Sequence, residues 1–226
     1  MAGMHDWTSF PGFEEAGEEL VQAVLEEAGK LTTDIIAPTN QIGDAEGAVF
    51  DAGAVTTPDA FKPMHGAFVE GGWPTLSAHP DLGGQGLPAS LEIAVTEMVT
   101  SANMAYSLQP LLTSGAVAAI NAHADDNLRM TYLPKMVSGE WSGAMNLTEP
   151  SAGSDVGALR AKAEAQPDGT YTITGQKIFI TWGEHDLCEN IIHLVLARLP
   201  GAPDGTKGIS MFIVPKFLVN EDGSLG

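Results

Sequence analysis

The chain has 226 residues, 44% of them apolar and 17% charged, and its formal net charge at pH 7 is −19. This composition predicts a sizeable core, while so acidic a surface repels phosphate and argues against nucleic acid as a partner. The sequence contains no apolar run long enough to span a bilayer. Its single cysteine, Cys188, excludes an internal disulfide framework, and residues 1–6 lack the basic start of a secretory signal, so we expect a cytoplasmic protein.

Residues 1–140 have the pattern of a helical domain. Apolar residues recur at helical spacing over residues 13–36, and Pro38 predicts the end of that helix. The Gly- and Ala-rich stretch 43–57 has no period and predicts a loop. Further helices are expected over residues 58–71, 89–103, 111–124 and 128–138.

The pattern changes at Trp141, where short β-rich runs begin. The pair Asp168-Gly169 between two of these runs is a hairpin signal. We therefore predict an α+β protein in which an all-α domain, residues 1–140, precedes a small antiparallel β barrel, residues 141–226. The expected strands cover residues 141–147, 159–165, 171–181, 191–199 and 208–214.

Two stretches of the β part are candidates for ligand binding. The first, TEPSAGSD at residues 148–155, can turn sharply while offering N–H groups and short side-chain donors to a polar or anionic ligand. The second, KIFITW at residues 177–182, supplies an apolar face that ends in a hydroxyl. Taken singly, each residue fits a turn or a packed strand better than a ligand site, but the joint pattern favours binding.

Together the two stretches resemble the flavin-binding pair of acyl-CoA dehydrogenases, in which TEP-x-AGSD precedes K-x-[WF]-I-T. The loop 79–86 is similar to the family's PEEYGGLG loop, residues 133–140 to its LP-to-GE segment, and residues 208–215 to its GIS-x-FIVP strand. Residues 197–199 and 215–220 are most similar to the large subfamily that includes 3-methylmercaptopropionyl-CoA dehydrogenase. The resemblance covers essentially the whole chain.

The resemblance implies FAD as the cofactor and an acyl-CoA thioester as the substrate, which is dehydrogenated to the trans-2-enoyl-CoA. Ser154 is implied to contact the substrate as well as the cofactor. The implied FAD contacts are, in chain order, Met145 and Leu147 along the path to the flavin ring, Thr148 at its pyrimidine edge, Gly153 and Ser154 at the pyrophosphate, Phe179 and Ile180 packed against the ring, and Thr181 at N5.

Family members continue with a third, helical domain that carries the catalytic glutamate, whereas this sequence ends at Gly226 within the β part. The resemblance therefore implies that the C-terminal helical domain and the catalytic residue are absent from this chain. It also implies electron-transferring flavoprotein as the electron acceptor, and a homodimer or homotetramer. Two alternatives stay open: an acyl-CoA oxidase or flavin-linked monooxygenase of the same fold, and a non-catalytic binding or assembly module. The acyl chain length is open too.

Other residues suggest chemistry less strongly. Glu149 and Asp155 are close in sequence, but Glu149 precedes a proline and is expected to accept hydrogen bonds from backbone N–H groups instead of acting as a base. The residues His185, Cys188 and His193 have part of a metal-ligand spacing, yet a second ligand pair is missing, so no metal site is expected. Cys188 has no evident activating neighbours and is expected to be unreactive.

Overall fold

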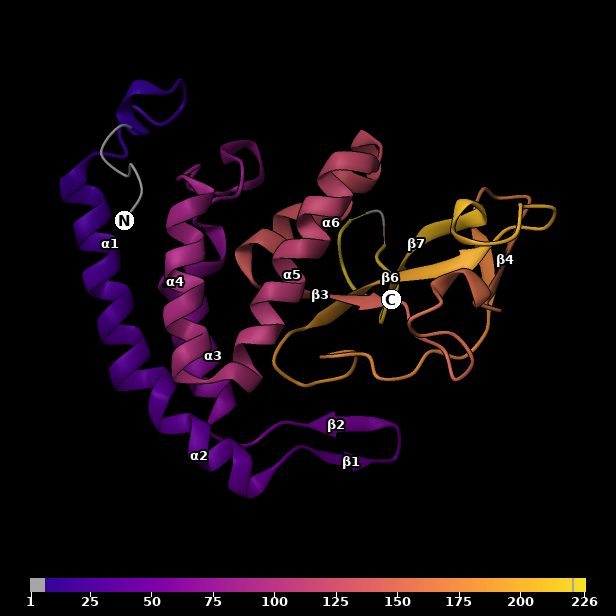
Figure 1. Cartoon of the computed structure of the whole chain (residues 1–226), viewed down its shortest axis with the longest axis horizontal. Coiled ribbons are helices and arrows are strands. Elements are labelled where there is room, and N and C mark those ends of the chain that lie inside the picture. The colour runs from indigo at the N-terminus through magenta and orange to yellow at the C-terminus, as the bar shows by residue number, and fades with distance from the viewer. Residues whose placement is uncertain (1–6, 221) are drawn as a thin grey trace.

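The computed structural model describes residues 7–220 and 222–226. The expectation about a secretory signal rests on residues 1–6 and lies outside the described residues. Figure 1 shows the helices gathered on one side of the molecule and the larger sheet on the other, with helix α5 (Met104–His123) next to strand β3 (Trp141–Asn146). The α+β class expected from the sequence is confirmed.

The helical part follows the predicted periodicity closely, except at some helix ends. Helix α5 begins at Met104, earlier than the expected residue 111, because the Asn103 side chain accepts a hydrogen bond from the Tyr106 N–H at 3.0 Å. Tyr106 is fully buried, so tertiary packing also holds this first turn. The other helices are α1 (Glu18–Lys30), α2 (Ala37–Glu46), α3 (Phe61–Glu70), α4 (Ala89–Ala102) and α6 (Asp126–Ser138).

The prediction that Pro38 ends the first helix is wrong. A π-helical turn, Leu31–Ile36, joins α1 to α2, and the N–H of Ala37 bonds to the carbonyl of Thr32. Pro38 therefore lies in the first turn of α2, where a missing N–H costs little. The turn is held by burial, since Ile36 is fully buried in the helical core.

The stretch 43–57, expected to be a loop, contains the end of α2 and a two-stranded hairpin. Strand β1 (Val49–Asp51) pairs antiparallel with β2 (Ala54–Thr56). The connecting residues Ala52 and Gly53 both have positive φ, at 47° and 91°, which is the conformation that a two-residue hairpin turn requires. The loop prediction is wrong here because strands of three residues leave almost no alternating pattern in the sequence.

The larger sheet contains the predicted hairpin. Strand β4 (Lys162–Ala165) pairs antiparallel with β5 (Tyr171–Thr174), and Gly169 in their connection has a φ of 87°. The strand expected over 171–181 ends at Thr174, so the prediction is wrong beyond that residue. The sheet is completed by β3, β6 (Asn190–Arg198) and β7 (Ile209–Pro215).

The sheet is mixed, which corrects the expected antiparallel pairing. One edge of β6 pairs antiparallel with β7, while the other pairs parallel with β3 and then, at Arg198, with Lys162 of β4. Strands β3 and β4 therefore lie one after the other along the same edge of β6, and the chain between them leaves this edge and returns to it. Within the described residues, the ladders form an open sheet in which β3, β5 and β7 each pair with one neighbouring strand only.

Buried side chains join the helical part to the sheet. Trp141 of β3 and Ile192 of β6 are fully buried against α5 and α6. Helix α5 approaches so closely that a Cβ at Gly143 would lie 2.5 Å from the Cβ of Ala116, so only glycine fits this position in β3. In the part of the chain that the structure describes, no helix has the length and apolarity needed to cross a membrane.

Candidate functional site

The first candidate segment leaves β3 as a tight turn. The backbone N–H of Glu149 donates to the carbonyl of Ala152 at 2.9 Å, and the reverse hydrogen bond is 3.1 Å long. This turn leaves Thr148 half-buried at the strand end and leaves Gly153 and Ser154 exposed. The sharp turn predicted from the sequence is confirmed.

The Glu149 carboxylate holds this turn from inside. It accepts hydrogen bonds from the N–H of Arg160 at 2.6 Å, the N–H of Ala161 at 3.0 Å and the ammonium of Lys177 at 2.9 Å. Burial alone would raise the pKa of this carboxyl, but the hydrogen bonds from Arg160, Lys177 and Ala161 outweigh that effect and lower the pKa. The prediction that Glu149 is a structural acceptor is confirmed, and Asp155 lies exposed outside this cluster.

The second candidate segment lies directly beside the first. The N–H of Ile178 donates to the carbonyl of Thr148 at 2.9 Å. The ammonium of Lys177 donates to the carbonyl of Leu147 at 3.1 Å as well as to Glu149. These bonds join stretches about 30 residues apart in sequence, so the fold brings together the two motifs that the sequence singles out.

Beyond Ile178 the backbone leaves regular structure. Phe179 and Trp182 have φ values of 57° and 51°, a region that bulky residues rarely adopt and that costs on the order of 1–3 kcal/mol for each residue. The Phe179 side chain is 88% exposed, which is incompatible with its reading as a packed strand residue. A left-handed, exposed aromatic residue is a sign that the conformation serves a ligand and not the core.

The remaining polar groups of these segments are free to bind a ligand. Among residues 7–220 and 222–226, the hydroxyls of Thr148, Ser154 and Thr181 have no hydrogen-bond partner. Apolar side chains lie in the same two segments, so donors and apolar area together suit a flat aromatic ligand with polar edges, such as a flavin. We call this set the candidate surface, which consists of Met145, Leu147, Thr148, Gly153, Ser154, Phe179, Ile180 and Thr181.

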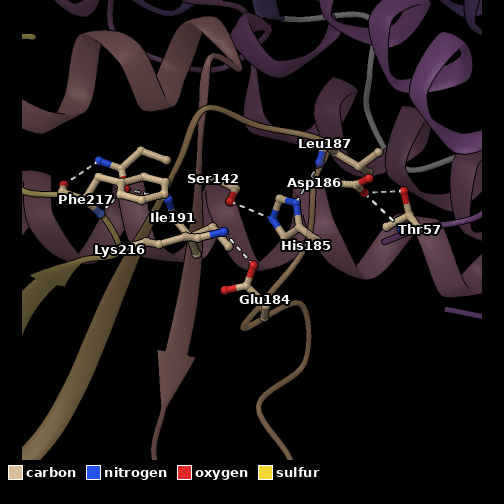
Figure 2. Close-up of polar contacts among 10 residues, drawn as sticks. Thr57, Ser142, Glu184, His185, Asp186, Leu187, Ile191, Lys216 and Phe217 are labelled. Atoms are coloured by element: carbon tan, nitrogen blue, oxygen red, sulfur yellow. Dashed lines mark hydrogen bonds and ion pairs between the residues drawn. The ribbon is translucent and has the colours of Figure 1, made fainter. Parts of the chain in front are cut away.

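Residues 182–189, here called the junction segment, link the sheet to the helical part. Figure 2 shows the His185 imidazole between Ser142 of β3 and the backbone of Leu187. Its Nδ1 accepts the N–H of Leu187 at 3.2 Å, so in the neutral ring Nε2 carries the proton and donates to the Ser142 hydroxyl at 2.9 Å. This arrangement could not be predicted from the sequence, because Ser142 and His185 are distant along the chain.

The next residue, Asp186, binds the helical part directly. Its Oδ1 accepts the backbone N–H of Thr57 at 2.9 Å and the Thr57 hydroxyl at 2.7 Å, and its Oδ2 lies 2.7 Å from the ammonium of Lys62. Burial would raise the pKa of Asp186, but the hydrogen bonds from Lys62 and Thr57 lower it to about 2. The carboxylate is therefore charged at neutral pH, and it anchors the segment.

Neutral groups, buried at His65 and Tyr106 and half-buried at Cys188, complete the junction. The Cys188 Sγ lies 3.5 Å from Nε2 of His65, whose Nδ1 lies 2.9 Å from the hydroxyl of Tyr106. Burial lowers the pKa of His65 to about 4 and raises the pKa of Cys188 to about 12. Burial likewise lowers the pKa of His185 to about 4. The thiol thus stays protonated at neutral pH, in agreement with its expected lack of reactivity.

The three residues weighed as metal ligands have separate contacts. His185 bonds to Ser142, Cys188 lies against His65, and the Nδ1 of His193 is 3.1 Å from an oxygen of Asn146. Within residues 7–220 and 222–226, no group of three or more histidine, cysteine or acidic side chains could hold a metal ion.

A cavity of about 960 Å³ lies in the helical part and was not foreseen from the sequence. It is lined mainly by α4, α5 and the 73–87 loop, and most of its lining is apolar. Glu92 projects polar atoms toward it and accepts hydrogen bonds from the hydroxyls of Ser77 and Ser114. No residue of the candidate surface lines this cavity, so the two are separate features.

Comparison with known families identifies both parts of the chain. The family model of the acyl-CoA dehydrogenase N-terminal domain matches residues 18–140, and that of the acyl-CoA dehydrogenase middle domain matches residues 144–223. Similarity to individual proteins extends across both matches.

The 3-methylmercaptopropionyl-CoA dehydrogenase of Ruegeria pomeroyi is 51% identical over 89% of this chain and 34% of that protein. A butyryl-CoA dehydrogenase of Syntrophomonas wolfei is 44% identical over 93% of this chain and 35% of that protein. The chain thus spans about a third of the length of these relatives. The structure of an acyl-CoA dehydrogenase from Bacillus anthracis complexed with FAD superposes with a TM-score of 0.70 at 20% identity, covering 90% of this chain and 32% of that one, which shows a shared fold.

Proposed function

The chain belongs to the acyl-CoA dehydrogenase family, and we propose that its candidate surface binds FAD in an enzyme that converts an acyl-CoA thioester to the trans-2-enoyl-CoA. The observation that carries this proposal is the hydrogen bond from Ile178 to the Thr148 carbonyl, because it aligns the two segments that resemble the family's flavin-binding pair. When bound, FAD supplies the acceptor for the hydride that leaves the β-carbon.

Each residue of the candidate surface has a proposed role. The Thr148 hydroxyl and backbone bind the pyrimidine edge of the flavin, and the Thr181 hydroxyl donates toward N5. The exposed Phe179 ring packs against the flavin, which would account for its left-handed backbone. The remaining roles are apolar contact by Met145, Leu147 and Ile180, pyrophosphate binding by Gly153 and Ser154, and substrate binding by Ser154.

We assign no catalytic base among the described residues. Removal of the α-proton needs a carboxylate that is free to accept it. Glu149 accepts three hydrogen bonds, is almost fully buried, and has a lowered pKa, all of which disfavour protonation. The base is therefore proposed to come from outside the described residues, as the family resemblance implies.

We also propose the domain boundaries that the family resemblance implies. Residues 1–140 form the helical domain, and residues 141–226 form a flavin-binding domain that approaches a barrel. Contact between Tyr171 of β5 and Phe212 of β7, with ring centroids 5.1 Å apart, supports this closure. We further propose electron-transferring flavoprotein as the electron acceptor, a homodimer or homotetramer, and a cytoplasmic location.

The FAD proposal predicts a stabilised, yellow protein. FAD at a hundredfold its dissociation constant should raise the free energy of unfolding by about 2.7 kcal/mol, measured by denaturation with and without FAD.

Replacement Phe179→Ala should weaken FAD binding roughly tenfold through loss of the ring contact. Phe50→Ala is the matched control, since Phe50 is 73% exposed on the β1–β2 hairpin and should not affect FAD. A purified protein that neither retains FAD nor is stabilised by it would contradict the proposal.

The role of Thr181 predicts a change in rate and not in stability. Thr181→Val keeps the side-chain shape but removes the hydroxyl, so in the full-length enzyme, which supplies the base, flavin reduction by acyl-CoA should slow roughly tenfold or more, with little change in Tm. Thr174→Val at the end of β5 is the control, because Thr174 is also exposed but lies outside the candidate surface. If anaerobic stopped-flow traces give equal rates of flavin reduction for both variants, the Thr181 hydroxyl has no role at the flavin.

A further inference from the structure

We propose that the junction segment positions the candidate surface, with Trp182 and Asp186 acting as positioning residues that hold Phe179 and Thr181 in their ligand-binding conformation. The inference rests on the proposed function, because it concerns the same flavin-facing residues. It adds a contribution from the helical part, which lies far from the two motifs in sequence.

Residues 175–181 need such positioning because the strand expected over residues 171–181 ends at Thr174. After Thr174, residues 175–181 belong to no ladder in the described part of the chain, so sheet pairing does not fix them. Upstream, Ile178 is fixed by its hydrogen bond to Thr148. Downstream, the residue that must fix Thr181 is the one that follows it, Trp182.

Trp182 is anchored to the helical part in two ways. Its indole Nε1–H donates to the backbone carbonyl of Ala105 in the first turn of α5, at 2.9 Å. Its ring stacks on Phe61 of α3, with centroids 6.4 Å apart and planes inclined by 25°. These contacts hold the left-handed backbone of Trp182, and a strained residue keeps its conformation only when its surroundings over-determine it.

Asp186 provides a second anchor. Its carboxylate binds Thr57, just beyond β2, and Lys62 in the first turn of α3. Figure 2 shows this carboxylate directed at Thr57, on the opposite side of His185 from Ser142. The junction segment is therefore fixed to two separate elements of the helical part, on the C-terminal side of the candidate surface.

A neighbouring ion pair offers a matched comparison. Glu184 also lies in the junction segment, but it pairs with Lys216, directly after β7, and so binds the sheet itself. Loss of this pair removes a charge contact from the same segment without releasing it from the helical part. The structure thus distinguishes anchoring to the helices from general stabilisation of the segment.

The test measures backbone mobility before it measures function. In the purified protein without FAD, the hydrogen-bonded amides within residues 178–183, those of Ile178 and Gly183, should exchange roughly tenfold faster in Trp182→Phe, which keeps the stacked ring but loses the indole N–H. Exchange over residues 148–155 should stay unchanged. Asp186→Asn should act in the same direction, whereas Glu184→Gln should match the unsubstituted protein. In titrations with FAD at a temperature where every variant is folded, the first two variants should bind FAD roughly tenfold more weakly than Glu184→Gln.

Unchanged exchange over residues 178–183 in Trp182→Phe would overturn the inference. If that variant does not fold, the same comparison between Asp186→Asn and Glu184→Gln decides it. Absence of FAD binding by the unsubstituted protein would contradict the proposed function, and the exchange data alone would then decide whether the segment is a positioning device.

Discussion

Replacement of Glu149 by glutamine should lower the free energy of unfolding by roughly 3 to 5 kcal/mol at pH 7, because it breaks a buried ion pair on one side only. The side chains of Glu149 and Lys177 are 4% and 9% exposed. Glutamine keeps the shape but leaves the Lys177 ammonium buried without its counter-charge. It also weakens the acceptor for the N–H groups of Arg160 and Ala161. Urea denaturation of the two proteins measures the difference.

Two further variants separate the ion pair from general effects. The double replacement Glu149→Gln with Lys177→Met should cost less than the sum of the two single replacements, because no buried charge is left unpaired. Glu164→Gln, at an exposed position of β4, should change stability by no more than about 0.5 kcal/mol. A loss below about 1 kcal/mol in Glu149→Gln would show that water reaches the pair.

The contribution of Glu149 to the free energy of unfolding decreases at low pH. Its pKa is lower in the folded protein than the ordinary value of 4.5. The stability it contributes is therefore fully present above pH 4.5 and is lost as the pH falls through the folded pKa. The difference between the original protein and Glu149→Gln should shrink below that pH.

Acidification from pH 7 to pH 4 should destabilise the protein through its buried histidines. The pKa values of His65 and His185 are lowered from 6.5 to about 4 by burial, so the unfolded chain binds protons more readily over this interval. Stability should be greatest above pH 6.5 and fall until the pH reaches about 4, by roughly 3 kcal/mol for each histidine. Burial also lowers the pKa of His193, which acts in the same direction.

The surroundings of these rings give the prediction its controls. His65 faces Tyr106 and Cys188, while His185 faces Ser142 and has the charges of Asp186 and Lys216 nearby. In His65→Gln, stability at pH 7 should fall, but the further loss on acidification should be smaller than in the original protein.

His123→Gln, at the exposed end of α5, should leave the pH profile unaltered. Denaturation curves at half-unit intervals between pH 4 and pH 8 provide the measurement. Identical slopes in the original protein and His65→Gln would contradict burial as the source of the pH dependence.

Local patterns in the sequence determined much of this protein. The apolar, Ala-rich stretch 89–103 predicts α4 almost to the residue, because helix-forming and apolar residues are visible in the local sequence alone. Asp168-Gly169 predicts the β4–β5 hairpin because few residues tolerate the positive φ found at Gly169. The turn at residues 148–155 follows from the same short-range chemistry. Glu149 was predicted to accept backbone N–H groups, but its donors Arg160 and Ala161 lie 11 and 12 residues further along the chain, so only the fold identifies them.

Tertiary structure decided the features that depend on distant partners. Trp141 pairs in parallel with Asn190, and no local period records that direction, so an antiparallel barrel was expected where a mixed sheet forms. The apolar run that contains Phe179 matches a strand, yet contacts of Ile178 with Thr148 and of Trp182 with Ala105 hold it as an exposed loop. Periodicity reports how a segment is buried, whereas pairing direction and left-handed backbone are set by contacts that only the folded chain creates.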